Sequence, residues 1–434
     1  MNPLILSTFD TSGGAARAAF RLHKGLRMMD INSQMLVEYK SSNDKNVIGA
    51  VNKFEKLVNQ IRPTLDNLPL KLYPQRQGMF SPQWFPDFIH SKIRNTNLLT
   101  NLPDIINLHW ICGYLSIETI AKFSQPIVWT FHDMWAISGG CQYSLKCDRY
   151  IDNCGNCPIL KSGKEQDISR WIWKRKASAW RKIDLVDSNM DLTIVTPSKW
   201  LKDCVSSSSL MKGFPVEVIP NGIDLQRYKP VEKDFAREWL NLPQDKQLIL
   251  FGAAFTSEKR KGIDLLYHAL TKFQQTDIHQ LVELVVFGTS ENQTELKNLN
   301  FKIHYLGSFQ DDISLALVYA AVDIFIAPSI QDNLPNTVME ALACGTPCVA
   351  FNIGGMPDMI EHQRNGYLAP AFEIDQLAHG IEWILSDQKR AIALQKNARQ
   401  KAEQEFSISL QAQRYSQLFQ KKIAARKEGR IKMN

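Results

Sequence analysis

One stretch of this sequence is most informative about its fold: Pro328-Ser-Ile-Gln-Asp332-Asn-Leu-Pro335-Asn-Thr-Val-Met-Glu340-Ala-Leu-Ala-Cys-Gly345. The four residues before it, 324–327, are apolar and predict a short buried strand. Pro335 suits the first turn of a helix, and Gly345 suits its end. The strand therefore leads into a loop at its carboxyl end, which is the edge where open α/β sheets bind ligands.

Two carboxylates occupy this loop and helix. Asp332 lies on the loop, and Glu340 lies one to two turns inside the helix. The start of a helix offers backbone N–H groups and a positive dipole end, which favour a phosphate. A carboxylate at Glu340 can accept two hydroxyl hydrogen bonds, as a ribose diol requires. The alternative is a solvated helix glutamate and a capping aspartate; we favour a nucleotide site.

Strand patterns alternate with helical patterns on both sides of this stretch, which predicts βαβ units and mostly parallel sheets. The strand candidates are residues 3–9, 105–109, 127–131, 192–196, 248–251, 281–287, 303–306, 324–327 and 348–351. A length of 434 residues also indicates more than one domain. We predict an α/β fold with two doubly wound Rossmann-like domains, residues 1–215 and 216–405. A helix over 406–434 is expected to cross back to the first domain and to end in a basic tail.

The Asp332-x7-Glu340 spacing resembles the acidic-x7-Glu signature of the retaining glycosyltransferases of family 4, which have the GT-B fold. That family usually has Glu at the first position, whereas Asp332 is one methylene shorter. The resemblance implies that Asp332 meets the transferred sugar and that Glu340 holds the ribose hydroxyls. It implies that the amides near Leu334, Asn336 and Thr337 face the diphosphate. It also implies two domains that face a deep cleft.

A second element resembling this family is Lys259-Arg260-Lys261-Gly262, which is similar to its Lys-Gly element. In the family a basic pair there neutralises the donor phosphates as the leaving group departs. Lys261 corresponds to the lysine. The family's arginine lies several residues earlier, where this chain has Phe255 and Thr256, and Arg260 is the candidate substitute.

Ser12-Gly13-Gly14 follows the first strand and is similar to the family's N-terminal glycine loop, which lies beneath the diphosphate and acceptor. Glycines allow close backbone approach. Arg17, one turn into the next helix, could reach a phosphate or could be a surface arginine.

Histidines follow two of the predicted strands. His132, in Thr130-Phe131-His132-Asp133, resembles the family's histidine after a strand, which contacts the sugar. His109 occupies a similar strand edge, and there a structural and a functional role remain equally open.

The resemblance implies a glycosyltransferase that moves a hexose-type sugar from a nucleoside diphosphate sugar to a saccharide or lipid-linked acceptor. It also implies retention of configuration, a place in surface polysaccharide or glycoconjugate synthesis, and no catalytic metal. The alternatives are a nucleotide-sugar epimerase or phosphorylase on the same fold, and a non-catalytic nucleotide-sugar-binding protein.

The formal net charge is +7, which suits anionic substrates or an anionic membrane surface. No basic region precedes the apolar run in residues 1–10, and the apolar stretch 315–328 is interrupted by Asp323. We expect a cytoplasmic protein, peripheral contact with an anionic membrane, and no nucleic-acid partner. The basic tail over 421–434 and the tryptophan-rich helix over 167–182 are candidates for that contact. The alternatives are a solvated tail and, for the helix, core packing or packing between domains.

Four of the eight cysteines crowd into an insertion over residues 139–164. They are Cys141, Cys147, Cys154 and Cys157, spaced Cys-x5-Cys-x6-Cys-x2-Cys. Four thiolates in a closed tetrahedral shell suit a structural zinc ion. Free or redox-active thiols and disulfides are the alternatives, and a cytosolic chain rarely keeps disulfides.

Overall fold

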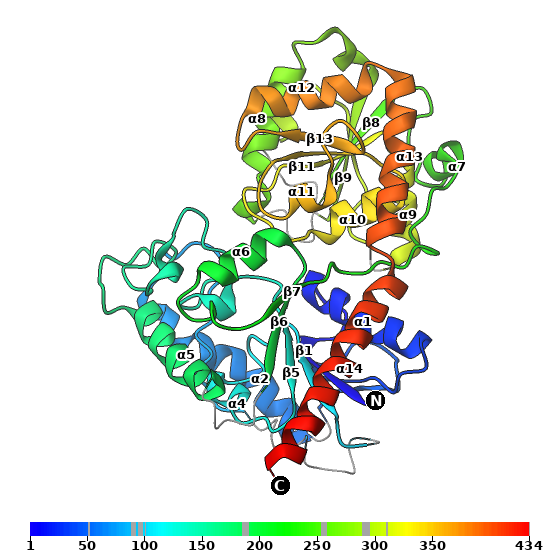
Figure 1. The fold of residues 1–434 in the computed structure, drawn as a ribbon. Coiled ribbons are helices and arrows are strands. Elements are labelled where there is room, and N and C mark those ends of the chain that lie inside the picture. Colours follow the sequence, from blue (N-terminus) through cyan, green and yellow to red (C-terminus); the bar gives the residue numbers. More distant parts are fainter. Residues whose placement is uncertain are drawn as a thin grey trace. The chain divides into compact units, whose positions relative to one another are not determined.

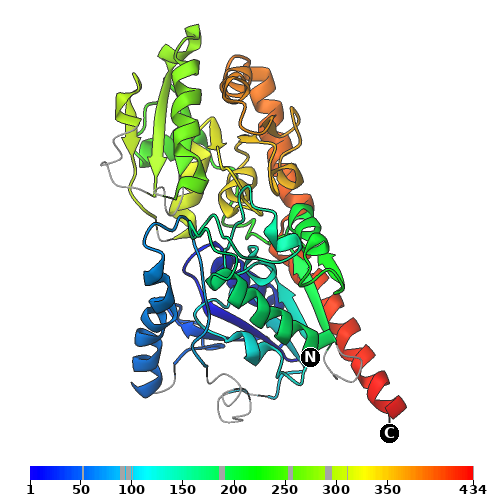
Figure 2. The same ribbon diagram turned by 90° about the vertical axis from the view of Figure 1, so that its left-hand side faces the viewer.

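A computed structural model gives the fold of this chain (Figures 1 and 2). It describes residues 1–50, 53–87, 93, 99, 101–184, 191–252, 258–288, 296–309 and 311–433. Phe255 and Thr256 lie outside the described residues. The chain divides into two compact units, each described by itself. Unit 1 comprises Met1–Pro220 and Ser409–Asn434, and unit 2 comprises Asn221–Ile408.

Unit 1 is built on a seven-stranded parallel sheet with the order β3-β2-β1-β4-β5-β6-β7. Its strands are β1 (Pro3–Phe9), β2 (Gln34–Tyr39), β3 (Val47–Ile48), β4 (Ile105–Leu108), β5 (Ile127–Thr130), β6 (Leu192–Thr196) and β7 (Val216–Val218). Its helices are α1 (Gly14–Met28), α2 (Lys53–Asn67), α4 (Ile117–Ile120), α5 (Ile168–Asp184), α6 (Lys199–Ser207) and α14 (Ile408–Met433). The central strands are short buried apolar runs because helices cover both faces of the sheet.

Alternation along β1 shows which helix covers which face, because successive side chains of a strand point to opposite sides. Leu4 and Leu6 share a core with the α5 residues Ile172 and Trp180. Ile5 lies in a second core with residues of α1 and α14.

Helix α14 follows unit 2 in sequence but packs in unit 1 (Figure 1). Its buried residues are Ala412, Tyr415, Leu418 and Phe419. The Tyr415 hydroxyl lies 2.9 Å from Thr130 Oγ1, and Lys422 Nζ lies 2.8 Å from an Asp191 carboxylate oxygen. These contacts join α14 to strand β5 and to the residue before strand β6.

The tryptophans of α5 divide between core and surface. Trp180 is fully buried and Trp173 packs partly buried against the same core. Trp171 is 46% exposed, with the Arg175 guanidinium 4.6 Å from its ring centroid. Core packing therefore accounts for two of the three tryptophans, and a membrane role for this helix stays a proposal.

Unit 2 contains a six-stranded parallel sheet with the order β10-β9-β8-β11-β12-β13. Its strands are β8 (Gln247–Gly252), β9 (Val282–Phe287), β10 (Ile303–Tyr305), β11 (Ile324–Ala327), β12 (Cys348–Phe351) and β13 (Gly366–Ala369). Its helices are α7 (Lys233–Trp239), α8 (Ile263–Phe273), α9 (Asp312–Ala321), α10 (Asn336–Ala343), α11 (Met356–Met359), α12 (Ile374–Leu385) and α13 (Gln388–Glu405). Leu250 and Phe325 pack with α9 and α10, whereas Ile249 and Ile326 pack with α8 and α12.

The predicted α/β class with two doubly wound, parallel-sheet domains is confirmed. Every strand named from the sequence is present within about one residue of its predicted ends. The sequence analysis missed β2, β3, β7 and β13. Among the helices that the structure describes, none is long and apolar enough to cross a membrane.

Candidate functional site

The residues predicted around Asp332 come together in unit 2. Strands β8 and β11 are hydrogen-bonded neighbours, so the loops that follow them share the carboxyl edge of the sheet. Lys261 follows β8 and Asp332 follows β11. The Lys261 ammonium lies 2.7 Å from Asp332 Oδ2, in an ion pair whose side chains are 21% and 7% exposed. Sequence alone did not indicate that these two residues contact each other.

Gly262 makes this contact sterically allowed. It has a φ of 73°, in the left-handed region, and joins the turn Lys259–Lys261 to α8. A Cβ atom at this position would overlap the carbonyl oxygen of Pro328. The β8 and β11 loops therefore approach closely at a point where only glycine fits.

Arg260 supplies a second cation to the same carboxylate. Its Nη1 lies 3.1 Å from Asp332 Oδ2 and donates to the Gln331 carbonyl oxygen at 2.7 Å. Its Nε and Nη2 donate to the two oxygens of Glu258 at 2.8 and 3.1 Å. Arg260 is thus fixed between two carboxylates, whereas Lys261 has the shorter contact to Asp332.

The charge of Asp332 is set by two opposing effects. Burial raises the pKa of its carboxyl, but attraction to Lys261 and then Arg260 outweighs burial and lowers the pKa to about 2. Ser329 Oγ and the Asn333 amide also donate to it, at 3.3 and 3.2 Å. Asp332 is therefore an ionised carboxylate at neutral pH.

Glu340 lies in α10, which begins at Asn336 directly after Pro335. The Glu340 side chain is buried and accepts a hydrogen bond from the Tyr319 hydroxyl at 3.2 Å. Leu334 is buried, whereas Asn336 and Thr337 are half-buried in the first turn of the helix. A buried glutamate excludes the alternative of a solvated helix residue at this position.

Unit 1 presents Gly13, Gly14 and His132 at the carboxyl edge of its own sheet. The two glycines follow β1 and are exposed, and Gly13 has a φ of 87°. Arg17 is half-buried in the first turn of α1, and its amide donates to the Gly13 carbonyl at 3.0 Å. His132 follows β5, which is separated from β1 by β4 alone.

Asp10 is a buried carboxylate beside the glycine loop that sequence analysis did not single out. It accepts hydrogen bonds from the backbone amides of Thr11, Ser41 and Ser42 at 2.9, 3.0 and 2.7 Å. The carboxylate therefore ties the loop after β1 to the loop after β2. In the sequence, Asp10 directly follows the buried-strand pattern of residues 3–9, and this position at the end of a strand was the signal for it.

His132 and His109 form a hydrogen-bonded pair. The rings are stacked with centroids 5.1 Å apart, and His109 Nδ1 lies 2.9 Å from His132 Nε2. Asn107 lies on the far side of His109, with its Oδ1 2.9 Å from His109 Nε2. A structural role for His109 is thus present, through its contact with His132.

Asn107 determines which ring nitrogens of His109 and His132 carry protons. Its Nδ2 donates to the Val128 carbonyl and to Thr130 Oγ1, at 2.9 and 3.2 Å, so its Oδ1 must accept from His109. Burial lowers the pKa of His109 well below the usual range, and burial lowers the pKa of His132 to about 4. Because His109 is neutral and its proton is on Nε2, its Nδ1 accepts a hydrogen bond from the N–H at His132 Nε2. A cavity of about 20 Å³ adjoins both rings and extends to Asp133 and Trp135.

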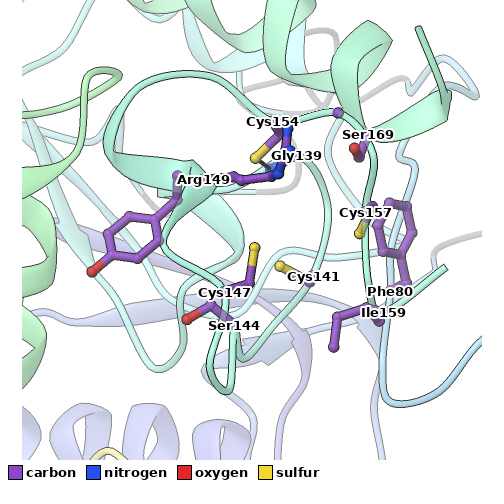
Figure 3. A pocket seen from close by; sticks show the side chains of 12 residues that line it. Phe80, Gly139, Cys141, Ser144, Cys147, Arg149, Cys154, Cys157, Ile159 and Ser169 are labelled. Carbon is purple, nitrogen blue, oxygen red and sulfur yellow. Dashed lines mark hydrogen bonds between the residues drawn. The ribbon is translucent and has the colours of Figure 1, made fainter. Parts of the chain in front are cut away.

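The four clustered cysteines line one cavity in unit 1 (Figure 3). None forms a disulfide. Across the residues that the structure describes, no three His, Cys, Asp or Glu side chains stand in an arrangement that could hold a metal ion.

Comparison with known proteins identifies the class of this chain. Residues 232–401 match the family described as glycosyl transferases group 1, and residues 12–227 match glycosyltransferase family 4. The chain belongs to the group 1/family 4 glycosyltransferases with a GT-B fold.

Curated relatives are related at moderate identity. The chain is 28% identical over 329 residues to a D-inositol 3-phosphate glycosyltransferase of Saccharomonospora viridis, covering 70% of this chain and 67% of that protein. It is 29% identical over 209 residues to an N,N'-diacetylbacillosaminyl-diphospho-undecaprenol alpha-1,3-N-acetylgalactosaminyltransferase of Campylobacter jejuni, covering 46% and 53%. It is 27% identical over 247 residues to an uncharacterized glycosyltransferase of Methanocaldococcus jannaschii, covering 53% and 60%. The chain thus spans between about half and two thirds of the length of these relatives.

Solved structures share the fold. Sucrose-phosphate synthase from Thermosynechococcus elongatus aligns with a TM-score of 0.67 at 18% identity, covering 98% of this chain and 100% of that chain. The Anabaena protein HepE in complex with UDP aligns with a TM-score of 0.63 at 18% identity, covering 97% and 100%. These structural similarities show the fold and do not identify the substrate.

Proposed function

We propose that this chain transfers a hexose-type sugar from a nucleoside diphosphate sugar to a hydroxyl of a saccharide or lipid-linked acceptor, with retention of anomeric configuration. The proposed setting is the synthesis of a surface polysaccharide or glycoconjugate. Its support is family membership together with one observation: the ionised Asp332, held by Lys261 and Arg260, lies on the loop that leads into α10.

Each residue of that cluster has a proposed role. The α10 start, with the amides near Leu334, Asn336 and Thr337, would receive the diphosphate. Lys261 and Arg260 would stabilise the charge that develops on the leaving diphosphate. Glu340 would accept hydrogen bonds from the ribose hydroxyls, and Asp332 would contact the transferred sugar.

The ion pair between Lys261 and Asp332 fits a lysine that stabilises the negative charge developing on the leaving diphosphate. In the structure Lys261 is already neutralised by Asp332 at 2.7 Å. As the glycosidic bond breaks, negative charge develops on the diphosphate and would compete with Asp332 for the Lys261 ammonium. The interaction between the ammonium and the diphosphate would therefore become stronger as the reaction proceeds. Interactions that grow toward the transition state raise turnover more than they raise ground-state affinity.

In unit 1, His132 is the proposed sugar contact, and Gly13, Gly14 and Arg17 are proposed to lie against the diphosphate. A neutral imidazole exchanges hydrogen bonds with sugar hydroxyls without adding a positive charge beside an oxocarbenium-like sugar. The depressed pKa of His132, caused by burial, keeps the ring in that neutral form at physiological pH.

The first test is a thermal-shift panel of nucleotides and nucleotide sugars. A ligand at one hundred times its dissociation constant stabilises the native state by about 2.7 kcal/mol. The donor so identified is then assayed for nucleoside diphosphate release with candidate acceptors, and the anomer of the product is determined by NMR. Conversion of the donor without an acceptor would indicate an epimerase instead, and binding without any turnover would indicate a non-catalytic protein.

Lys261→Ala tests the phosphate role. We expect turnover to fall at least tenfold while nucleotide affinity changes less, and Arg260 stays within 3.1 Å of Asp332 to limit structural damage. The matched control is Lys259→Ala, which removes an exposed lysine two residues earlier. A transfer rate within about twofold of wild type for Lys261→Ala would remove Lys261 from the proposed mechanism.

A further inference from the structure

The cysteine cluster lies in a loop region with little regular structure. Between β5 and α5 the chain has two short turns, Trp135–Ile137 and Arg149–Ile151. A segment this long inside a compact domain requires its own stabilising contacts. Cys141, Cys154 and Cys157 are nonetheless buried, and Cys147 is partly exposed.

All four thiols surround the same small cavity, and Figure 3 shows their sulfur atoms around one space. The cavity measures about 10 Å³, which is room for about one water-sized particle. Every pair of the four thiols interacts electrostatically. Cys141, Cys147 and the turn that carries Cys154 and Cys157 therefore surround one space.

The backbone is folded tightly around these thiols. Gly155 has a φ of 140°, and a Cβ there would overlap the carbonyl oxygen of Glu165. The Asn156 amide donates to the Lys164 carbonyl at 2.8 Å, and the Cys157 amide donates to Asp167 at 2.9 Å. This turn holds Cys154 and Cys157 against the cavity.

A backbone amide points at one of the sulfur atoms, because the Gly139 amide donates to Cys154 Sγ at 3.0 Å. Such an N–H group favours a thiolate over a neutral thiol, and a thiolate is the form that binds metal. Without metal, burial is the larger effect and raises the pKa of the Cys141, Cys154 and Cys157 thiols.

Lys176 of α5 is fully buried beside the cluster. Its Nζ donates to the backbone carbonyls of Ser138, at 3.0 Å, and Trp135. Its strongest electrostatic partner is Cys112, followed by Cys141 and Cys154 of the cluster and then by Asp133. Burial lowers the pKa of Lys176 to about 7, because burying a cation is costly unless negative charge lies near it. Ionised Cys141 and Cys154 would supply that charge.

We propose that Cys141, Cys147, Cys154 and Cys157 bind one zinc ion as a structural tetrathiolate site, with Lys176 as its neighbouring counter-charge. Four thiolates around one divalent ion carry a net charge of 2−, and Lys176 offsets part of it. Binding converts four S–H groups to four S–Zn bonds and releases four protons to solvent. Because no three donors of the described residues already stand in ligand positions, the thiol side chains must turn about their Cα–Cβ bonds.

The shell is closed, so the ion has no open position for substrate. Its role would be to fix the loop that follows His132 and Asp133, which both line the neighbouring cavity. The inference is independent of the proposed transferase activity, because its readouts are metal content and stability.

Elemental analysis of the full chain, purified under reducing conditions without added metal, tests the site. We expect about one zinc per chain and X-ray absorption distances near 2.3 Å for zinc–sulfur bonds. Titration of the wild-type protein with an organomercurial should release that zinc in step with about four thiolates, and this readout needs no variant. Absence of metal with four free thiols, a disulfide found by mass spectrometry, or iron with acid-labile sulfide would each overturn the proposal.

The Cys154→Ser/Cys157→Ser double variant should lose the zinc. The matched control is Cys344→Ala/Cys348→Ala, which also removes two buried cysteines but in unit 2, and should keep it. Zinc retained in the first variant would place the ion elsewhere.

Lys176→Met tests the counter-charge. Removing an outer partner of a metal site typically lowers metal affinity 10–100-fold, which competition with a chelator measures. Lys174→Met, on the exposed face of the same helix, is the control and should leave affinity unchanged. Unchanged zinc affinity in Lys176→Met would remove Lys176 from the proposal.

Discussion

Asp332 shows how a single side chain connects this site to the stability of its unit. The Asp332 carboxylate is held by Lys261 at 2.7 Å and by Arg260 at 3.1 Å. Because its one carboxylate faces two cations in a buried place, its charge is needed by the folded state as well as by the proposed chemistry. Two predictions at the residue scale concern the stability that Asp332 provides and the nucleotide affinity that Glu340 provides.

The first prediction concerns pH. The folded-state pKa of Asp332 is about 2, below the ordinary value of 3.8. A lowered carboxyl pKa stabilises the fold fully above the unfolded-state pKa, and this contribution is lost as pH falls through the folded-state pKa. We therefore expect Asp332→Asn to be destabilised by roughly 2 kcal/mol at pH 7. The difference from wild type should stay constant down to about pH 4 and shrink below it.

Urea unfolding of both proteins at pH 7, 4 and 3 measures this difference. Asp375→Asn is the control, because the Asp375 side chain is 78% exposed in its contact with Lys272 and its loss should change little. A pH-independent gap between Asp332→Asn and wild type over this whole range would contradict the assignment of an ionised, paired Asp332.

The second prediction concerns Glu340. Replacing it with Gln keeps the side-chain volume, and the Tyr319 hydroxyl can still donate to the amide oxygen. The fold should persist, while loss of charge-assisted hydrogen bonds to ribose should weaken nucleoside diphosphate binding by roughly 1.5–3 kcal/mol. Calorimetric titration measures the affinity, with Glu238→Gln on the exposed side of α7 as the control. Equal affinities in Glu340→Gln and wild type would place Glu340 outside the site.

At the scale of elements, the site depends on how the turn Lys259–Lys261 meets the start of the β11 loop. The Ile330 amide donates to the Arg260 carbonyl at 2.7 Å, so the two loops are also joined by backbone. Gly262 permits the approach. The positions of Lys261 and Asp332 are therefore set by backbone packing and not by the ion pair alone.

Gly262→Ala tests this packing. The new Cβ would overlap Pro328 and would occupy a left-handed conformation, with a φ of 73°. Gly307→Ala is the matched control, because Gly307 has a φ of 69° but no atom within 4 Å of a new Cβ. Both changes should cost about 1–2 kcal/mol for the conformation. Only Gly262→Ala should lose further stability and transfer activity; thermal unfolding and the rate assay measure these, and equal losses would refute the close-approach argument.

At the scale of the whole molecule, the chain completes unit 1 with residues that follow unit 2. Tyr415, Leu418 and Phe419 of α14 are buried with Ile5 and Val128 of the unit 1 sheet. Each buried side chain of this size contributes about 1.5–3 kcal/mol. Together they are comparable to the 5–15 kcal/mol that stabilises a typical domain.

Truncation before Ser409 is therefore expected to destabilise unit 1 although it removes no predicted site residue. Hydrogen exchange should accelerate in peptides covering β1, β5 and β6, while unit 2 peptides stay protected. Truncation after Lys427 removes only the last residues of the basic tail and should preserve protection in unit 1. Unchanged hydrogen exchange after the truncation before Ser409 would show that α14 is dispensable for unit 1.

The sequence by itself determined the fold class, most strand positions, and the loops that carry the site. Apolar runs ending in polar or glycine residues are local patterns, and parallel strands all present their carboxyl ends to one edge. The Asp332-x7-Glu340 spacing is also local, since it lies within one loop and helix. A local apolar pattern needs several residues to stand out, so the strands β3 and β7, with two and three residues, were not predicted.

Only the tertiary structure decided which side chains meet. Lys261 and Asp332 are 71 residues apart and touch because β8 and β11 are neighbours in the sheet. Asn107 fixes the protons of His109, and thereby of His132, because β4 lies beside β5. Lys176 reaches the cysteine cluster from helix α5, whereas the cysteines lie in the loop before that helix. Strand order and helix packing arise from burial of the whole chain, so no local pattern records these contacts.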